Sequence, residues 1–129
     1  MANRSRIVLE KIVHAEAHSE DLHGQTLVAN VMLNRHRDSS FPTGIHNVVF
    51  QRDINTDGRM TYQFSPVGNG AYTAAVPSDS LRQAVTNSLD GVDYSQYAAF
   101  FIVTSALEGS WHQRRLTRLF SHGGHTFFR

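Results

Sequence analysis

The sequence predicts an α+β domain in which helices come first and a small antiparallel sheet comes late. Apolar residues recur at three- and four-residue spacing in three segments, the last of which ends near residue 91. A short apolar and aromatic run follows at residues 98–103, and a glycine pair interrupts the final stretch. A chain of 129 residues suits one core and is too short for two, so we expect a single domain over residues 1–129.

Two amphipathic helices are expected in the first third of the chain. The first covers about residues 6–17, where Val8 and Ile12 lie four apart on one face. The second covers about residues 22–37 and ends before Phe41-Pro42, because proline and small polar residues interrupt the pattern. Its apolar stripe consists of Leu27, Val28, Val31 and Met32.

The third helix is expected between Ser78, a suitable N-cap, and Gly91, which can close it. Before it, residues 47–77 are rich in glycine, proline and asparagine, which predicts loops around an irregular sheet with β-like pieces at 48–50 and 62–65. After it, residues 98–103 predict a buried strand, and residues 116–128 predict a β-hairpin around Gly123-Gly124.

Composition excludes several classes of protein. The chain is 40% apolar and 18% charged, which is typical of a globular protein, and its net charge of +1 argues against a nucleic-acid clamp. No apolar run approaches the roughly 20 residues of a membrane span. Cysteine is absent, which excludes disulfides and thiolate zinc sites. The first residues lack the apolar core of a secretory signal peptide, so we expect another route of delivery to any target outside the cytoplasm.

Glu16 is the main candidate for catalysis. It lies four residues after Ile12 and shares its helix face, so its carboxyl group is expected at the edge of the core. Burial disfavours the charged form of a carboxyl group and raises its pKa, as a general acid near neutral pH requires. Glu20 would raise the pKa of Glu16 further if the helix continued to that residue. The same spacing also fits a helix end that faces solvent.

The chain contains eight histidines, which raises the question of a metal site. There is no His-Glu-x-x-His motif, and the glycine pair between His122 and His125 leaves their relative geometry undefined. We therefore expect no metal and no cofactor. A zinc peptidase or amidase that uses His112, His122 or His125 with a glutamate is an alternative.

Aromatic and amide side chains gather at Tyr62-Gln63-Phe64-Ser65 and at Ser110-Trp111-His112. Such sets are typical of sugar-binding clefts, since aromatic rings pack on pyranose faces while amides hydrogen-bond to hydroxyl and acetamido groups. Core positions for Phe64 and Trp111 fit the sequence equally well.

Taken in order, these motifs resemble the cell-wall hydrolase family typified by the spore-cortex-lytic and germination enzymes SleB and CwlJ. The matching segments are residues 12–17, Glu20, 24–25, 28–35, 41–42, 48–51, 63–67, 80–91, 111–112 and 125–128, nearly the whole chain. The resemblance implies a lysozyme-like domain that acts on peptidoglycan glycan strands, with the glutamate of the family's Ala-Glu-Ala motif at Glu16.

The expected catalytic residues are Glu16 as the central acid and Glu20 as a residue that modulates it. The expected substrate-binding residues are Tyr62, Gln63, Phe64, Ser65, Trp111, His112 and His125. Arg35 is expected instead to pair with a carboxylate inside the fold.

Three departures from the family pattern bear on the site. The sequence after Glu16 reads Ala-His-Ser-Glu where the family has Ala-Arg-Gly-Glu, residues 52–61 resemble an insertion, and Ile102-Val103-Thr104 stands in place of Tyr-Asn-Pro. We therefore expect one side of the cleft to be remodelled. A minimal catalytic unit of this kind fits a spore coat, a phage endolysin or a virion component, acting at the cell wall after delivery.

The resemblance and the single convincing glutamate favour a lytic transglycosylase that cuts the β-1,4 bond between N-acetylmuramic acid and N-acetylglucosamine. A muramidase would need a second carboxylate about 5 Å away to retain configuration, or roughly 6.5–9.5 Å away to invert it. A non-catalytic glycan-binding or virion structural module of lysozyme-like shape is a further alternative.

Overall fold

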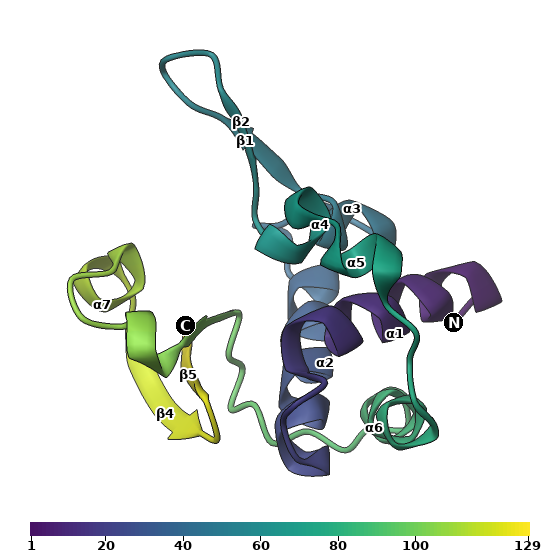
Figure 1. The fold of residues 1–129 in the computed structure, drawn as a ribbon. Coiled ribbons are helices and arrows are strands. Elements are labelled where there is room, and N and C mark those ends of the chain that lie inside the picture. Colours follow the sequence, from purple (N-terminus) through teal and green to yellow (C-terminus); the bar gives the residue numbers. More distant parts are fainter.

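The computed structural model describes all 129 residues as a helical half and a smaller half built around a sheet (Figure 1). The helices are α1 (Asn3–Ala17), α2 (Leu22–Arg37), α3 (Ile45–Val49), α4 (Ser65–Asn69), α5 (Ala71–Ala74), α6 (Asp79–Leu89), the 3-10 turn η1 (Thr104–Ala106) and α7 (Trp111–Arg115). The strands are β1 (Arg52–Ile54), β2 (Met60–Tyr62), β3 (Phe100–Val103), β4 (Arg118–His122) and β5 (His125–Phe128). No helix is both long enough and apolar enough to cross a membrane.

The helical half is held together by one apolar cluster, to which α1, α2, α3 and α6 each contribute. Its central members are Leu9, Ile12, Val13, Val28, Met32, Val48, Val49, Leu81 and Val85. The helices predicted over 22–37 and after Ser78 are confirmed, and the hydroxyl of Ser78 accepts from the N–H of Leu81 at 3.2 Å. Helix α1 starts at Asn3, and the apolar pattern misses this first turn because none of its residues lies in the core.

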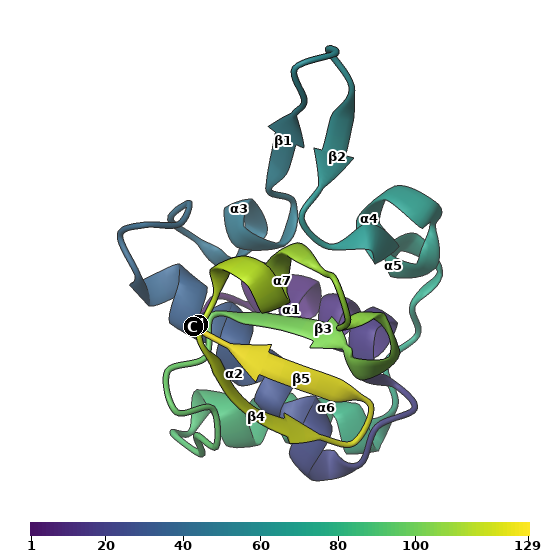
Figure 2. The same cartoon turned by 90° about the vertical axis from the view of Figure 1, so that its left-hand side faces the viewer.

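The second half is a three-stranded antiparallel sheet in the order β3-β5-β4 (Figure 2). The predicted hairpin around Gly123-Gly124 is confirmed as β4 and β5, and Phe101 of β3 pairs with Phe127 of β5. Strand β5 lies in the centre and is buried along its length. A small apolar cluster of Leu27, Val31, Ala98 and Phe127 fastens this sheet to α2.

Residues 45–65 differ from the sequence prediction. The β-like piece expected at 48–50 belongs to α3, because a helical turn lets both Val48 and Val49 enter the core. Of the piece expected at 62–65, only Tyr62 lies in a strand, and Ser65 begins α4 with a proline in its first turn. The segment that resembles an insertion forms the β1–β2 hairpin, which projects from the body of the molecule (Figure 1).

The connection from α6 to β3 has little regular structure, and side chains of α2 hold it in place. Asn30 donates to the hydroxyl of Ser88 at 2.7 Å and to the carbonyl of Val92 at 2.9 Å, and its own carbonyl accepts from the N–H of Tyr94 at 3.1 Å. Asn34 donates to the carbonyl of Ala98 at 2.8 Å. These bonds fix the path by which the chain enters β3.

We expect Asn30→Ala to lower the free energy of unfolding by about 2–4 kcal/mol, because it leaves the buried hydroxyl of Ser88 and the part-buried backbone groups of Val92 and Tyr94 without their partner. Urea unfolding measures the loss. Asn47→Ala is the matched control, since Asn47 is exposed and makes a single side-chain bond. A loss for Asn30→Ala no larger than for this control would contradict the role given to Asn30.

Candidate active site

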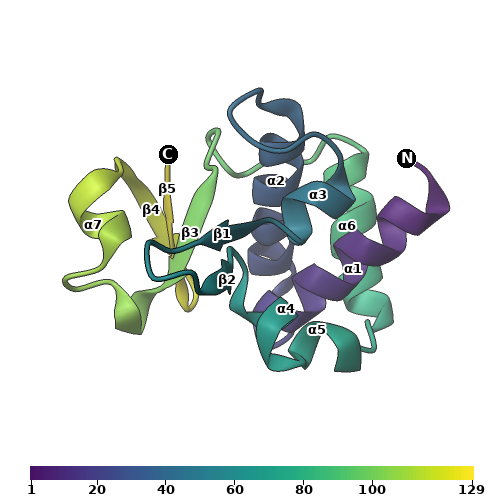
Figure 3. The ribbon, with the colours of Figure 1, turned by 90° about the horizontal axis from the view of Figure 1, so that it is seen from above.

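A cavity of about 510 Å³ is lined by residues of α1, α2 and α4 from the helical half and by residues of β3, η1 and α7. Figure 3 shows how these two sides of the molecule are arranged. Most of the site residues expected from the sequence line it, namely Glu16, Tyr62, Gln63, Phe64, Ser65, Trp111 and His112. Segments far apart in the chain, from residue 16 to residue 112, therefore meet at one place.

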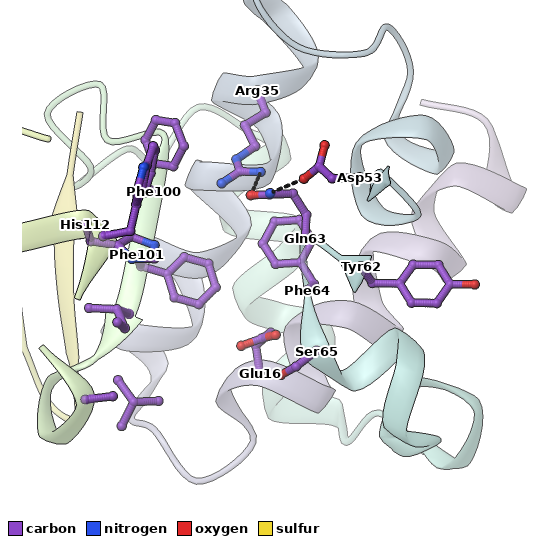
Figure 4. Close-up of a pocket in the computed structure, with 14 residues that line it drawn as sticks. Glu16, Arg35, Asp53, Tyr62, Gln63, Phe64, Ser65, Phe100, Phe101 and His112 are labelled. Atoms are coloured by element: carbon purple, nitrogen blue, oxygen red, sulfur yellow. Dashed lines mark hydrogen bonds between the residues drawn. The ribbon is translucent and has the colours of Figure 1, made fainter. Parts of the chain in front are cut away.

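Glu16 lies in the last turn of α1 and is partly buried. In Figure 4 its carboxyl group lies at one end of the cavity, and Arg35 lies at the other. Desolvation raises the pKa of Glu16 to about 7, and no neighbouring charge contributes to the shift. A carboxyl group with this pKa is part protonated at neutral pH, so it can both give and accept a proton.

One wall of the cavity is apolar and comes from β3, η1 and α7. Phe100, Phe101, Ile102, Val103 and Ala106 line it, and the sequence prediction missed all of these residues. The run at 98–103 was expected to be a buried strand, but β3 begins at Phe100 and is an edge strand whose residues are all partly or fully exposed. An edge strand at a cavity and a buried strand share the same apolar composition, which explains the error.

The aromatic side chains of this wall reach the solvent. Trp111, the first residue of α7, is 50% exposed, and its ring lies 6.0 Å from that of Phe100. The helix is fixed by Ser110, whose hydroxyl accepts from the N–H of Gln113 at 3.1 Å. Phe64, by contrast, is a core residue that also reaches the cavity.

The end of the cavity away from Glu16 is polar. Gln63 accepts from Arg35 at 3.4 Å and donates to the carboxylate of Asp53 at 3.2 Å, so an amide links a cation to an anion (Figure 4). Asp53 lies in the hairpin that resembles an insertion, and no pattern in the sequence predicts its place at the cavity. Arg35 does not pair with a carboxylate, so that expectation is wrong.

Two expected site residues lie outside the cavity. Helix α1 ends at Ala17, so Glu20 does not continue its face, and its carboxylate instead accepts from the N–H of Gly124 in the β4–β5 turn at 2.9 Å. His125 is 4% exposed and packs on the rings of Phe101 and Phe127. His125 therefore does not line the cavity and Glu20 contacts the sheet, and the functional roles expected for both residues stay predictions.

The histidines considered as metal ligands do not come together as one group, since His122 pairs with His125 across the β4–β5 hairpin whereas His112 lies in α7. His112 lines the cavity, where burial and the charge of Arg35 lower its pKa. His122 contacts the carboxylate of Asp21 at 2.9 Å. No three His, Asp or Glu side chains are grouped so that they could hold a metal ion.

Comparison with known proteins identifies related chains. A model of the Cell Wall Hydrolase family matches residues 19–128. The chain is 26% identical to the spore cortex-lytic enzyme of Bacillus subtilis over 85% of this chain and 33% of that one. It is 28% identical to the spore cortex-lytic enzyme of Halalkalibacterium halodurans over 81% of this chain and 28% of that one. The chain thus spans about a third of the length of the curated relatives it matches.

Two solved structures have the same fold. The catalytic domain of the germination-specific lytic transglycosylase SleB from Bacillus anthracis superposes with a TM-score of 0.82 and 22% identity, covering 100% of this chain and 97% of that one. The catalytic domain of the SleB protein from Bacillus cereus superposes with a TM-score of 0.78 and 24% identity, covering 100% and 93%. The expected α+β, lysozyme-like fold of SleB type is therefore confirmed.

The raised pKa of Glu16 makes stability depend on pH. Between about pH 4.5 and 7 the folded protein binds more protons at Glu16 than the unfolded chain, so the free energy of unfolding falls as pH rises through this window. We expect Glu16→Gln to remove this slope and to stabilise the protein at pH 8 by up to about 3 kcal/mol. Urea unfolding of both proteins from pH 4 to 8 measures these changes. If the free energy of unfolding depended on pH in the same way in both proteins, the raised pKa of Glu16 would be contradicted.

Proposed function

Since the chain belongs to the Cell Wall Hydrolase family, we propose that it cleaves the glycan strands of peptidoglycan with Glu16 as general acid and base. One observation carries the proposal: a partly buried carboxyl group with a pKa of about 7 lies in a cavity that has an exposed aromatic wall. The names of the relatives support peptidoglycan as the substrate class, since they are spore cortex-lytic enzymes and a lytic transglycosylase.

In the proposed reaction, protonated Glu16 gives its proton to the oxygen of the β-1,4 bond that follows N-acetylmuramic acid. The bond from the anomeric carbon to that oxygen breaks as positive charge develops on the sugar ring. The Glu16 carboxylate then accepts the proton of the muramyl 6-hydroxyl, whose oxygen bonds to the anomeric carbon. The products are a 1,6-anhydro end and a free hydroxyl, and Glu16 regains its proton.

Transglycosylation is favoured over hydrolysis because it needs no second carboxylate beside Glu16. Asp53 is the other carboxylate at the cavity, and its Oδ2 is occupied by the hydrogen bond from Gln63. In Figure 4 it lies across the cavity from Glu16, beyond Gln63. A hydrolase would use such a group as nucleophile or base, and its products would carry reducing ends.

Further lining residues are proposed to bind the sugar chain. Trp111 offers a ring face to a pyranose ring, while Gln63 and Ser65 offer hydrogen bonds to hydroxyl and acetamido groups. The ring of Tyr62 points away from the cavity in Figure 4. The wall on which the protein acts, a spore cortex or another cell wall, depends on where the protein is delivered. None of the relatives described above is named a phage protein, so the endolysin and virion settings gain no support from them.

We expect Glu16→Gln to lower the rate of peptidoglycan solubilisation by about 10²–10⁴-fold with the fold intact, because a general acid contributes an effect of this size. In the unsubstituted protein the rate should fall as pH rises above about 7, since Glu16 then loses its proton. Glu108→Gln, at an exposed position outside the cavity, is the control. Mass spectrometry of the released muropeptides should find 1,6-anhydro ends; reducing ends would indicate hydrolysis, and free stem peptides would contradict the proposal.

We expect Trp111→Ala to lower kcat/KM on soluble glycan strands by about tenfold, since an aromatic contact of this kind contributes roughly 1 kcal/mol beyond area burial. Trp111→Phe should retain most of the rate. Tyr97→Ala serves as the comparison, because Tyr97 is 76% exposed and lies outside the cavity. Equal effects of the two alanine substitutions would argue against a sugar contact at Trp111.

A further inference from the structure

A buried cation without an anion lies in the wall of the cavity. Arg35 is 2% exposed, yet it takes part in none of the ion pairs of the chain. Burying a charge is costly unless an opposite charge or strong hydrogen bonds compensate. The position therefore calls for a partner that the protein itself does not supply.

The contacts of Arg35 hold its guanidinium group in one orientation. Nε donates to the carbonyl of Ala99 at 2.6 Å, and Nη1 donates to the side-chain carbonyl of Gln63 at 3.4 Å. The rings of Phe41, Phe64 and Phe100 lie 4.8–4.9 Å from the guanidinium carbon. Nη2 makes no hydrogen bond within the protein, and Figure 4 shows the group directed at the cavity.

The surrounding groups keep this arrangement cationic. Desolvation lowers the pKa of Arg35 only to about 10, so it is charged at neutral pH. His112 of α7 lies near Arg35, and its lowered pKa leaves it neutral at pH 7, so it adds no second positive charge. Asp53 is bound through Gln63, whose amide nitrogen donates to Asp53 while its oxygen accepts from Arg35.

We propose that Arg35, oriented by Gln63 and Ala99, is an anion subsite at the end of the cavity opposite Glu16 and binds a carboxylate of the substrate strand. A guanidinium fork matches the two oxygens of a carboxylate, and its weak hydration suits a site walled by aromatic rings. The proposal rests on the proposed function, because it takes the ligand to be peptidoglycan. Such strands offer carboxylates from two sources, the lactyl group of peptide-free muramic acid and the stem peptides.

The test measures binding to the Glu16→Gln protein, with Arg35 intact, by calorimetry. Three tetrasaccharides of alternating N-acetylglucosamine and N-acetylmuramic acid are compared: one with free lactyl carboxylates, one with lactyl carboxamides and one with stem peptides. We expect a carboxylate-bearing ligand to bind about tenfold or more tightly than the carboxamide. Tight binding of the first ligand alone assigns the lactyl carboxylate, and tight binding of the peptide-bearing one assigns the stem peptide. Equal affinity for all three would overturn the subsite.

Substitutions at the polar end localise the effect. Arg35→Gln should abolish the preference for carboxylate while changing affinity for the carboxamide by no more than about twofold, and Arg37→Gln, exposed on the same helix, should leave the preference intact. Asp53→Asn should strengthen binding of the carboxylate ligand alone, because it removes a negative charge from that end. If Arg35→Gln fails to fold, Asp53→Asn and the comparison of the three ligands still test the anion subsite.

The two proposals fail in different ways. Glycan cleavage without any preference for carboxylates would overturn the anion subsite and leave the proposed function standing. A clear preference in a protein that cleaves no glycan would support the subsite and contradict the catalytic role. If none of the three tetrasaccharides binds, the anion subsite is overturned, and the assay of peptidoglycan cleavage decides the proposed function separately.

Discussion

The structure depends on the hydrogen bonds that one face of α2 supplies to the irregular connection before β3. A segment without regular structure leaves some of its N–H and C=O groups unpaired, and when it is packed against a core those groups need partners from elsewhere. Asn30, Asn34 and Arg35 provide them, and their spacing in the helix puts them along one side. Because β3 forms a wall of the cavity, these bonds set the position of that wall relative to α2.

The cavity exists because the two halves of the molecule are held by separate apolar clusters and do not pack together along their whole length. The helices share one core, and a smaller cluster centred on Phe127 joins the sheet to α2. The edge strand β3 packs on that cluster through Phe101, and the strand itself is partly or fully exposed. Glu16 lies where this opening reaches the end of α1, which removes enough water to shift its pKa and leaves room for a ligand. The desolvation that disfavours the charged carboxylate, and so costs stability at high pH, is the same desolvation that suits it for proton transfer.

The sequence predicts the helices best, because a helix is decided by residues that lie close together in the chain. A repeat of apolar residues, an N-cap at Ser78 and a proline after the second helix predict elements whose hydrogen bonds join residues three or four apart. The position of Glu16 at the edge of the core follows from the same repeat, since Ile12 on that face is fully buried. The glycine pair likewise predicts its hairpin, because tight turns are decided within a few residues. The remaining interpretation came from an ordered set of motifs that resembles a known family, and the fold it implied is confirmed.

Only the tertiary structure decided which polar groups share a site. Glu20 contacts a turn 104 residues away, and His125 is buried in the central strand of the sheet, although both belong to family motifs in the sequence. Arg35 meets three aromatic rings instead of the carboxylate expected for it, and Asp53 reaches the cavity from a hairpin that looked like an insertion. The reason is physical: backbone pairing within a helix or hairpin is a local matter, whereas the surroundings of a side chain come from segments that only packing brings together.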